Sequence, residues 1–119
     1  MATLYAFLGP HLIDALVDRL YARIIEDPEL APFFRHMDMV RQRERMTAFL
    51  TIATGGSTRS PVDMRTAHQR PVKMGMTDQH FDRVVGHLVA ELQAFSVPAE
   101  KIAELGALVE TLRSAVLNR

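Results

Sequence analysis

Apolar side chains recur at steps of three and four residues through most of this chain, and this spacing is the strongest constraint on its fold. Pro10 suits the first position of a helix, and Asp27 ends that helix because the residue before Pro28 is pushed out of the helical region. One face of this helix carries Leu12, Ile13, Leu16, Val17, Leu20, Tyr21 and Ile24. No segment alternates between apolar and polar residues as a half-buried strand does. The sequence therefore predicts an all-α fold.

Three more long helices are expected after a short turn over residues 28–34. Asp38 is a good N-cap for the second helix, and Gly55 with Gly56 ends it. Thr77 begins the third helix, and Pro98 precedes the last. Their apolar stripes are, in order, Met39, Gln42, Met46, Phe49, Leu50 and Ala53; Phe81, Val84, Val85, Leu88, Val89, Leu92 and Phe95; and Ile102, Leu105, Val109, Leu112 and Val116. In the loosely structured middle, residues 55–63 and 71–76 are expected to be loops around a helical turn over 64–68.

Length and composition limit the kinds of protein that this chain can be. Its 119 residues predict a single domain over 1–119, and its 48% hydrophobic content is too high for a disordered segment. The absence of cysteine excludes disulfides, thiolate metal sites and cysteine nucleophiles. The longest uncharged stretches, residues 1–13 and 46–58, are too short to span a bilayer, and the first does not resemble a signal peptide. We therefore expect a soluble cytoplasmic domain.

Charge is balanced over the whole chain but not along it. Lysine and arginine together number fourteen, as do the acidic residues, which argues against a protein held on nucleic acid or on an anionic membrane. Residues 35–70 nevertheless carry seven arginines against three acidic side chains, a local balance of +4. These arginines are Arg35, Arg41, Arg43, Arg45, Arg59, Arg65 and Arg70. The pattern fits either a binding site for an anion or an ordinary solvated face.

Polar side chains stand at three positions where a simple helical bundle has aliphatic ones. Tyr21 and Gln42 lie on the apolar stripes of the first two long helices, and His68 follows Met64 by one helical turn. Each alone has an ordinary structural explanation, such as a hydroxyl at the rim of the core or a histidine satisfied within it. Together, on three helices around a loosely structured centre, they predict a pocket. The histidines lack the spacing of a zinc hydrolase, and the chain has no phosphate-binding glycine loop or serine elbow.

Ordered motifs along nearly the whole chain resemble the truncated (two-over-two) haemoglobins, and in particular their group I. The motifs are Leu20-Tyr21-Ala22-Arg23, Asp27-Pro28-Glu29-Leu30, Phe33-Phe34, Asp38-Met39, Gln42-Arg43, Ala48-Phe49-Leu50, Gly55-Gly56, Met64-Arg65-Thr66-Ala67-His68, His80-Phe81-Asp82 and Val97-Pro98. The resemblance implies a two-over-two globin-like helical sandwich around a haem. A loosely structured segment would precede the histidine that binds the iron.

The resemblance also implies a role for each candidate site residue. His68 matches the proximal histidine that binds haem iron, and Phe34 matches the phenylalanine that packs on the porphyrin. Tyr21 and Gln42 match the distal positions that donate hydrogen bonds to bound dioxygen. The implied pocket lining is Met46, Phe49, Leu50, Phe81, Val85 and Leu88, and the implied partners of the haem propionates are Arg41 and Arg45.

Several positions depart from the family pattern. Gly9-Pro10 replaces the first glycine pair, and the usual tyrosine after Gly55-Gly56 is absent. Some relatives carry histidine or lysine at the position of Arg45 and use it as a distal iron ligand, but a guanidinium offers no lone pair. Leu112 stands where a few relatives carry a histidine that bonds to a haem vinyl group. We therefore expect haem b held without a covalent bond, and a distal side free of that internal ligand.

The implied function is reversible binding of dioxygen and of other diatomics such as nitric oxide, with oxygen transport or nitric oxide scavenging as its use. Scavenging, as a nitric oxide dioxygenase, would need an external reductase, because this sequence holds no flavin or nicotinamide module. The alternative is a non-haem or sensor-type helical interaction module on a globin-like fold. We expect a monomer that binds neither nucleic acid nor a membrane.

Overall fold

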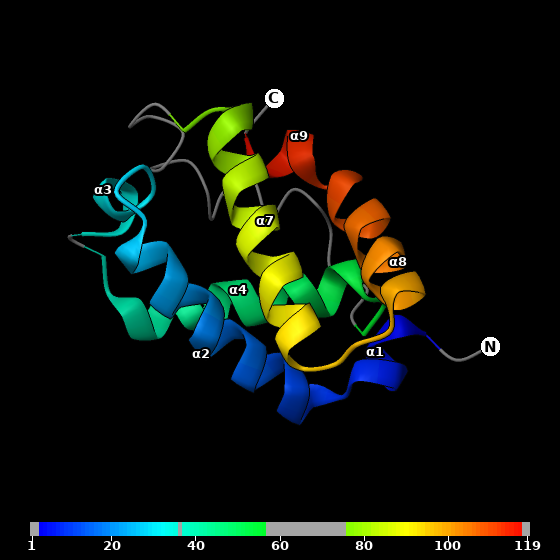
Figure 1. Ribbon diagram of the computed structural model, residues 1–119. Coiled ribbons are helices and arrows are strands. Elements are labelled where there is room, and N and C mark those ends of the chain that lie inside the picture. Colours follow the sequence, from blue (N-terminus) through cyan, green and yellow to red (C-terminus); the bar gives the residue numbers. More distant parts are fainter. Residues whose placement is uncertain (1–2, 36, 57–75, 118–119) are drawn as a thin grey trace.

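A computed structural model describes residues 3–35, 37–56 and 76–117, and the chain is helical through most of these ranges (Figure 1). The helices are α1 (Leu4–Leu8), α2 (Pro10–Glu26), α3 (Ala31–Phe34), α4 (Met39–Ala53), α7 (Asp78–Ala94), α8 (Ala99–Glu110) and α9 (Arg113–Val116). The predicted all-α fold and its four long helices are confirmed. The helical turn expected over 64–68, including His68, lies outside the described residues, as do Arg59, Arg65, Arg70 and most of the two flanking loops.

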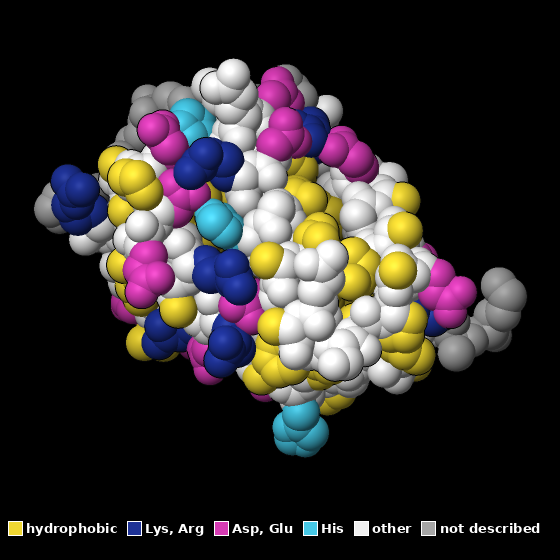
Figure 2. Space-filling model, in the orientation of Figure 1, with side chains coloured by type: hydrophobic (Ala, Val, Ile, Leu, Met, Phe, Trp, Pro, Cys, Tyr) yellow, Lys and Arg dark blue, Asp and Glu magenta, His cyan; other side chains and the backbone are white. Residues whose placement is uncertain are grey.

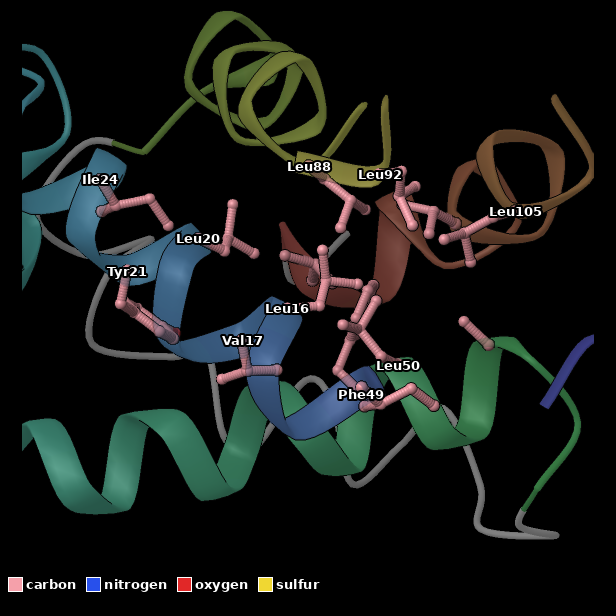
Figure 3. Packing of buried hydrophobic residues seen from close by; sticks show 14 of the residues in the cluster. Leu16, Val17, Leu20, Tyr21, Ile24, Phe49, Leu50, Leu88, Leu92 and Leu105 are labelled. Atoms are coloured by element: carbon pink, nitrogen blue, oxygen red, sulfur yellow. The ribbon is translucent and has the colours of Figure 1, made fainter. Parts of the chain in front are cut away.

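Helix α2 lies at the centre of the fold and contacts α4 on one side and α7 on the other. Helix α8 in turn packs against both α7 and α4, so the long helices form two stacked pairs. In Figure 3, Leu16 and Leu20 of α2 point toward Leu88 and Leu92 of α7, while Phe49 and Leu50 rise from α4. Leu16 and Leu20 are fully buried, as expected for the middle of the predicted stripe. This core places one apolar face of each long helix toward a shared interior.

Local hydrogen bonds begin two of these helices where the sequence predicts. The Asp38 carboxylate accepts from the backbone N–H of Val40 at 3.0 Å and from that of Arg41 at 3.4 Å, which confirms the N-cap of α4. At α7 the backbone N–H of Thr77 donates to Nδ1 of His80 at 3.0 Å. His80 therefore takes the place that glutamate or glutamine has in the common capping box.

Helix α1 was not expected from the sequence, where residues 1–13 stood out only as an uncharged stretch. The Thr3 hydroxyl oxygen caps it by accepting from the backbone N–H of Ala6 at 3.1 Å. The Tyr5 N–H donates to the Thr54 carbonyl at 2.9 Å and so attaches α1 to the end of α4. Gly9, with φ of +81°, then separates α1 from Pro10 at the start of α2.

The two glycines after α4 end that helix and also make room for α1. Gly55 has φ of +90°, a conformation that glycine adopts without strain. A Cβ atom on Gly56 would lie 2.6 Å from the Tyr5 ring. The predicted stop of α4 at this pair is confirmed, and the close approach of Tyr5 explains why the second residue has no side chain.

The last predicted helix is interrupted, and the structure divides it into α8 and α9. The Thr111 hydroxyl donates to the Leu108 carbonyl at 2.6 Å, and the Leu112 N–H donates to the Val109 carbonyl three residues back. A threonine side chain that bonds a nearby carbonyl competes with the regular helical ladder. The apolar spacing of Leu105, Val109 and Leu112 continues across the interruption, so the pattern alone gave no sign of it.

Two buried carboxylates connect α2 and α7. Glu91 of α7 accepts from Nε of Arg19 at 3.0 Å and from Nε of Arg23 at 2.6 Å, and both arginines belong to α2. Hydrogen bonds, first that from Arg23 and then that from Arg19, lower the pKa of Glu91 although burial opposes them. Figure 2 shows charged and histidine side chains gathered along this boundary between α2 and α7.

The second carboxylate is Asp27, at the end of α2. Its Oδ2 accepts from Nε of Arg83 at 3.0 Å and its Oδ1 from Nη2 of Arg83 at 2.8 Å, and Nε2 of His87 lies 2.8 Å from Oδ2. The Arg83 hydrogen bonds hold the pKa of Asp27 well below its usual value, with burial opposing them and His87 assisting. Asp27 also accepts from the backbone N–H of Glu29, which fixes the turn toward α3.

Arg113 ties α9 to the start of α7. Its Nη1 lies 3.1 Å from Oδ1 of Asp78, and its guanidinium lies 4.5 Å above the centre of the Phe81 ring. The contact helps to fix Phe81, whose ring turns inward from the first turn of α7. Among the described residues, no helix combines the length and the apolar character needed to cross a membrane.

We predict that acid weakens the fold through Asp27 and Glu91. Both have a lower pKa in the folded chain than the value of about 4 that an unfolded carboxyl has. Their contribution is therefore complete above that value and is lost as pH falls through the folded-state pKa. Glu91→Gln should lower the free energy of unfolding at pH 7 by about 1–3 kcal/mol and flatten its fall between about pH 5 and pH 2, measured by urea denaturation.

Asp14→Asn, which changes an exposed carboxylate on α2, is the matched control and should keep the wild-type pH dependence. An unchanged pH dependence in Glu91→Gln would contradict the role given to this buried carboxylate.

We also predict that Gly56→Ala detaches α1. The added methyl group would meet the Tyr5 ring at 2.6 Å, so the substitution should cost about 1–3 kcal/mol in thermal or urea unfolding. Gly106→Ala in α8 is the control because its Cβ would meet no atom within 4 Å, and alanine there should be neutral or stabilising. Equal effects of the two substitutions would show that α1 does not need Gly56.

Candidate functional site

An apolar pocket of about 60 Å³ lies where α2, α4 and α7 meet. Side chains from α3, α8 and α9 complete its walls. The described residues that line it are Leu20, Tyr21, Ile24, Phe34, Gln42, Met46, Phe49, Leu50, Met76, Phe81, Val84, Val85, Leu88, Val109 and Val116. Among these residues, only Tyr21 and Gln42 have side chains that form strong hydrogen bonds, because the methionine sulfur is a weak acceptor. The pocket is therefore an apolar chamber with one polar corner.

The polar corner is buried. Tyr21 is 3% exposed and Gln42 is 5% exposed, and their side chains are hydrogen-bonded to each other. Burial raises the pKa of Tyr21 far above its usual value, and the Gln42 hydrogen bond and the positive charge of Arg45 offset only part of that rise. The phenol therefore stays protonated at neutral pH, and its O–H remains a hydrogen-bond donor.

Arg45 reaches the same corner from the outer side of α4. Its Nη1 donates to Oε1 of Gln42 at 2.8 Å, while its side chain is otherwise exposed. The Gln42 oxygen is thus occupied on the solvent side, and the amide nitrogen is the part of the group that remains to donate.

Phe34 packs against the polar corner. Its ring meets the Tyr21 ring edge to face, with centroids 5.7 Å apart and planes at 76°. The short helix α3 that carries Phe34 is held in place by Asp27, whose carbonyl accepts from the N–H groups of Leu30 and Ala31 at 3.0 and 2.8 Å. The backbone carbonyl of Asp27 thereby helps to position an aromatic wall of the pocket.

Similarity to known proteins covers almost the entire chain. Residues 3–118 match the bacterial-like globin family. The group 1 truncated hemoglobin GlbN of Synechocystis sp. is 40% identical over 111 residues, which are 91% of this chain and 90% of that protein. The chain belongs to the group 1 truncated haemoglobins. The group 1 truncated hemoglobin LI410 of Chlamydomonas moewusii is 39% identical over 98% of this chain and 68% of its own length.

Solved structures give the same result for the fold. The 2/2 hemoglobin from Synechococcus sp. PCC 7002, in the cyanomet state and with covalently attached heme, superposes with a TM-score of 0.89 at 37% identity. That alignment covers 99% of this chain and all of the other. Truncated hemoglobin from Tetrahymena pyriformis in its Fe(III) form gives 0.85 at 30% identity over 98% of both chains. The two-over-two globin fold expected from the sequence is confirmed.

As a truncated haemoglobin, the chain is a haem-binding globin that takes up small gaseous ligands. The described residues fit that cofactor, because the pocket offers apolar walls with three phenylalanine rings and a single buried pair of hydrogen-bonding groups. An apolar wall suits the porphyrin faces, and a protonated phenol beside an amide suits a small polar ligand. The alternative of a non-haem interaction module is not favoured by the family or by the fold.

The structure brings together most of the predicted site residues. The pocket is lined by Tyr21, Phe34, Gln42, Met46, Phe49, Leu50, Phe81, Val85 and Leu88, all of which were candidates from the sequence. Arg45 contacts Gln42, while Arg41 lies exposed near the start of α4. The roles of Arg41 and Arg45 toward the propionates, and that of His68 toward the iron, stay predictions.

Sequence reasoning missed some of the lining. The additional residues are Leu20, Ile24, Met76, Val84, Val109 and Val116. All but Met76 stand on the apolar stripes already recognised, so the signal was present, but a stripe does not show which of its members face a pocket and which face a neighbouring helix.

Proposed function

We propose that this truncated haemoglobin binds dioxygen reversibly and that Tyr21 and Gln42 hold the bound ligand. The observation that carries the proposal is the buried hydrogen-bonded pair in an otherwise apolar pocket. Replacing two hydrogen-bonded partners by apolar groups of the same shape can be neutral or stabilising, so packing alone does not require a polar pair at these two positions. A ligand that accepts hydrogen bonds from Tyr21 and Gln42 would explain why polar residues occupy these two positions.

Haem, when bound, supplies the iron that takes up the diatomic ligand. This chain's own residues supply the environment: the Tyr21 O–H and the Gln42 amide N–H are hydrogen-bond donors, and the apolar walls exclude water. Donors of this kind favour a ligand that gains negative charge on binding, as dioxygen does, over carbon monoxide, which gains little. We assign the proximal ligand to His68 from the family resemblance.

Residues at two positions distinguish this chain from relatives that modify or block the haem. The Synechococcus protein has covalently attached heme. Leu112, which the family resemblance places where a few relatives carry a histidine that bonds to a haem vinyl group, is here a buried aliphatic residue. Arg45, at the position of a distal ligand in some relatives, has no lone pair for iron and instead donates to Gln42. Both features support haem b held without a covalent bond and a distal side open to external ligands.

Nitric oxide is a further proposed ligand, and its scavenging would make the protein a nitric oxide dioxygenase. Sustained turnover needs an electron donor, and we propose that a reductase supplies it. Among the described residues, the large apolar side chains that lie exposed are Phe7, Ile25 and Val40, and we propose that the protein is a monomer. Oxygen transport and a cytoplasmic location stay predictions.

Tyr21→Phe and Gln42→Leu should each speed dioxygen release from the ferrous protein. Removing one donor to bound dioxygen should raise the dissociation rate constant by about tenfold, equivalent to about 1.4 kcal/mol, and change carbon monoxide dissociation much less. Stopped-flow ligand replacement measures both rates. Val84→Leu, an apolar change in the same pocket, is the control. Unchanged dioxygen dissociation in both donor variants would refute the proposed role of the pair.

His68→Ala should weaken haem retention strongly, because the resemblance makes this side chain the protein's bond to the iron. Haem transfer to an excess of an apoprotein acceptor measures the rate of loss, which should rise at least about a hundredfold on breaking a metal–ligand bond. His11→Ala, at an exposed position in the first turn of α2, should leave that rate unchanged. Equal rates in the wild type and His68→Ala would exclude His68 as the proximal ligand.

A further inference from the structure

We infer that Arg45 is a positioning residue that fixes the orientation of the Gln42 amide, so that its NH₂ group and not its oxygen faces Tyr21 and the pocket. The inference rests on the proposed function, because an oriented donor matters only if a ligand in the pocket uses it. It assigns to Arg45 a role on this chain's own glutamine, in addition to the predicted contact with a propionate.

A glutamine amide can turn by half a rotation with little change in shape, and the two orientations present opposite chemistry to the pocket. With NH₂ inward the side chain donates, and with oxygen inward it only accepts. An accepting oxygen beside a ligand that gains negative charge would be repulsive. Packing alone hardly distinguishes the two, because oxygen and NH₂ are similar in size. A hydrogen-bond partner must therefore decide the orientation.

The described contacts supply that partner from outside the pocket. Nη1 of Arg45 donates to Oε1 of Gln42 at 2.8 Å, and a guanidinium can only donate. The reversed amide would turn its NH₂ toward the guanidinium and leave two donors facing each other. The residues are three positions apart on α4, so both lie on adjoining parts of one helical face.

The charge of Arg45 also strengthens the inward donor. A carbonyl oxygen that accepts from a cation draws electron density from the amide nitrogen, so the N–H groups on the inner side become better donors. Through this polarised amide, the positive charge of Arg45 strengthens a hydrogen-bond donor in the apolar pocket, although the arginine side chain itself does not line that pocket. Gln42, at 5% exposure, is shielded from competing water, whereas the exposed arginine keeps most of its own hydration.

Arg43 provides a matched control on the same helix. Like Arg45, it contributes positive charge near Tyr21, but its Nε pairs with Oδ1 of Asp18 at 3.5 Å. Arg43→Met and Arg45→Met each remove one guanidinium and keep an unbranched, helix-favouring side chain. Since Arg45 is exposed, its replacement should not disturb the core. A difference between the two variants therefore reports more than the loss of a nearby charge, and the Gln42→Leu background in the second test separates the hydrogen bond to Gln42 from the predicted propionate contact of Arg45.

The first test uses the haem-loaded ferrous protein with carbon monoxide bound, which is diamagnetic and suited to NMR. The Gln42 side-chain N–H signals are identified by their absence in Gln42→Leu, and their exchange with solvent is measured. Exchange should become at least about tenfold faster in Arg45→Met and stay at the wild-type rate in Arg43→Met. Equal exchange in the wild type and Arg45→Met would overturn the inference.

The second test combines substitutions. Arg45→Met should raise the dioxygen dissociation rate constant by about threefold to tenfold in the wild-type background and leave it unchanged when Gln42 is already leucine. An equal increase in both backgrounds would show that Arg45 acts without Gln42 and would overturn the inference. If instead Tyr21→Phe and Gln42→Leu both leave dioxygen dissociation unchanged while Arg45→Met still alters the amide signals, the proposed function fails and the positioning role stands.

Discussion

Helix α2 packs against both α4 and α7, and these two contacts hold the other long helices and the pocket in place. One stripe of α2 is divided between two neighbours, so that Leu16 and Leu20 face α7 while Tyr21 reaches the pocket beside α4. The two buried carboxylates, Glu91 and Asp27, then join α2 and α7 by reciprocal ion pairs with arginines of the opposite helix. The helices are thereby fixed in relation to one another along their length, and the pocket walls are fixed with them.

Polar groups enter this apolar interior at only a few described positions, and each has partners. The carboxylates of Asp27 and Glu91 are paired at the α2–α7 boundary, where their arginines remain in contact with water. Tyr21 and Gln42 lie deeper and satisfy each other, with Arg45 supporting the pair from outside. In the proposed function, the protonated phenol and the amide at the edge of the apolar chamber are the polar half of a gas-binding site. The haem family supplies the chemical reason for their burial.

The sequence predicted the elements whose cause is local. The long stripes, the Asp38 cap and the stop at Gly55 and Gly56 follow from spacing and from the conformational preferences of a few residues. The polar positions Tyr21, Gln42 and His68 already predicted a pocket. The family resemblance added its walls, such as Phe34, because these residues come from separate helices and no local pattern shows that they meet.

What the sequence did not predict depends on contacts between distant segments. Helix α1 is stabilised by a hydrogen bond to Thr54 and by the room that Gly56 leaves for the Tyr5 ring, and both residues lie about fifty positions further along the chain. Glu91 lies on the inner face of α7, but only the fold shows that Arg19 and Arg23 reach it. The bond from Arg45 to Gln42 was missed for another reason, since an exposed arginine at this spacing has several plausible partners and only the side-chain geometry selects one.

We propose that the pocket bounded by α2, α4 and α7 is the distal chamber of a haem whose sixth position is open to external ligands. The absorption spectrum of the ferrous protein, loaded with one equivalent of haem and kept free of added ligand, distinguishes an open sixth position from an occupied one. We expect a strong Soret band with the single broad visible band of five-coordinate ferrous haem. Two sharp visible bands would reveal an internal sixth ligand, and the absence of a Soret band would show that the pocket holds no haem; either result would refute the proposal.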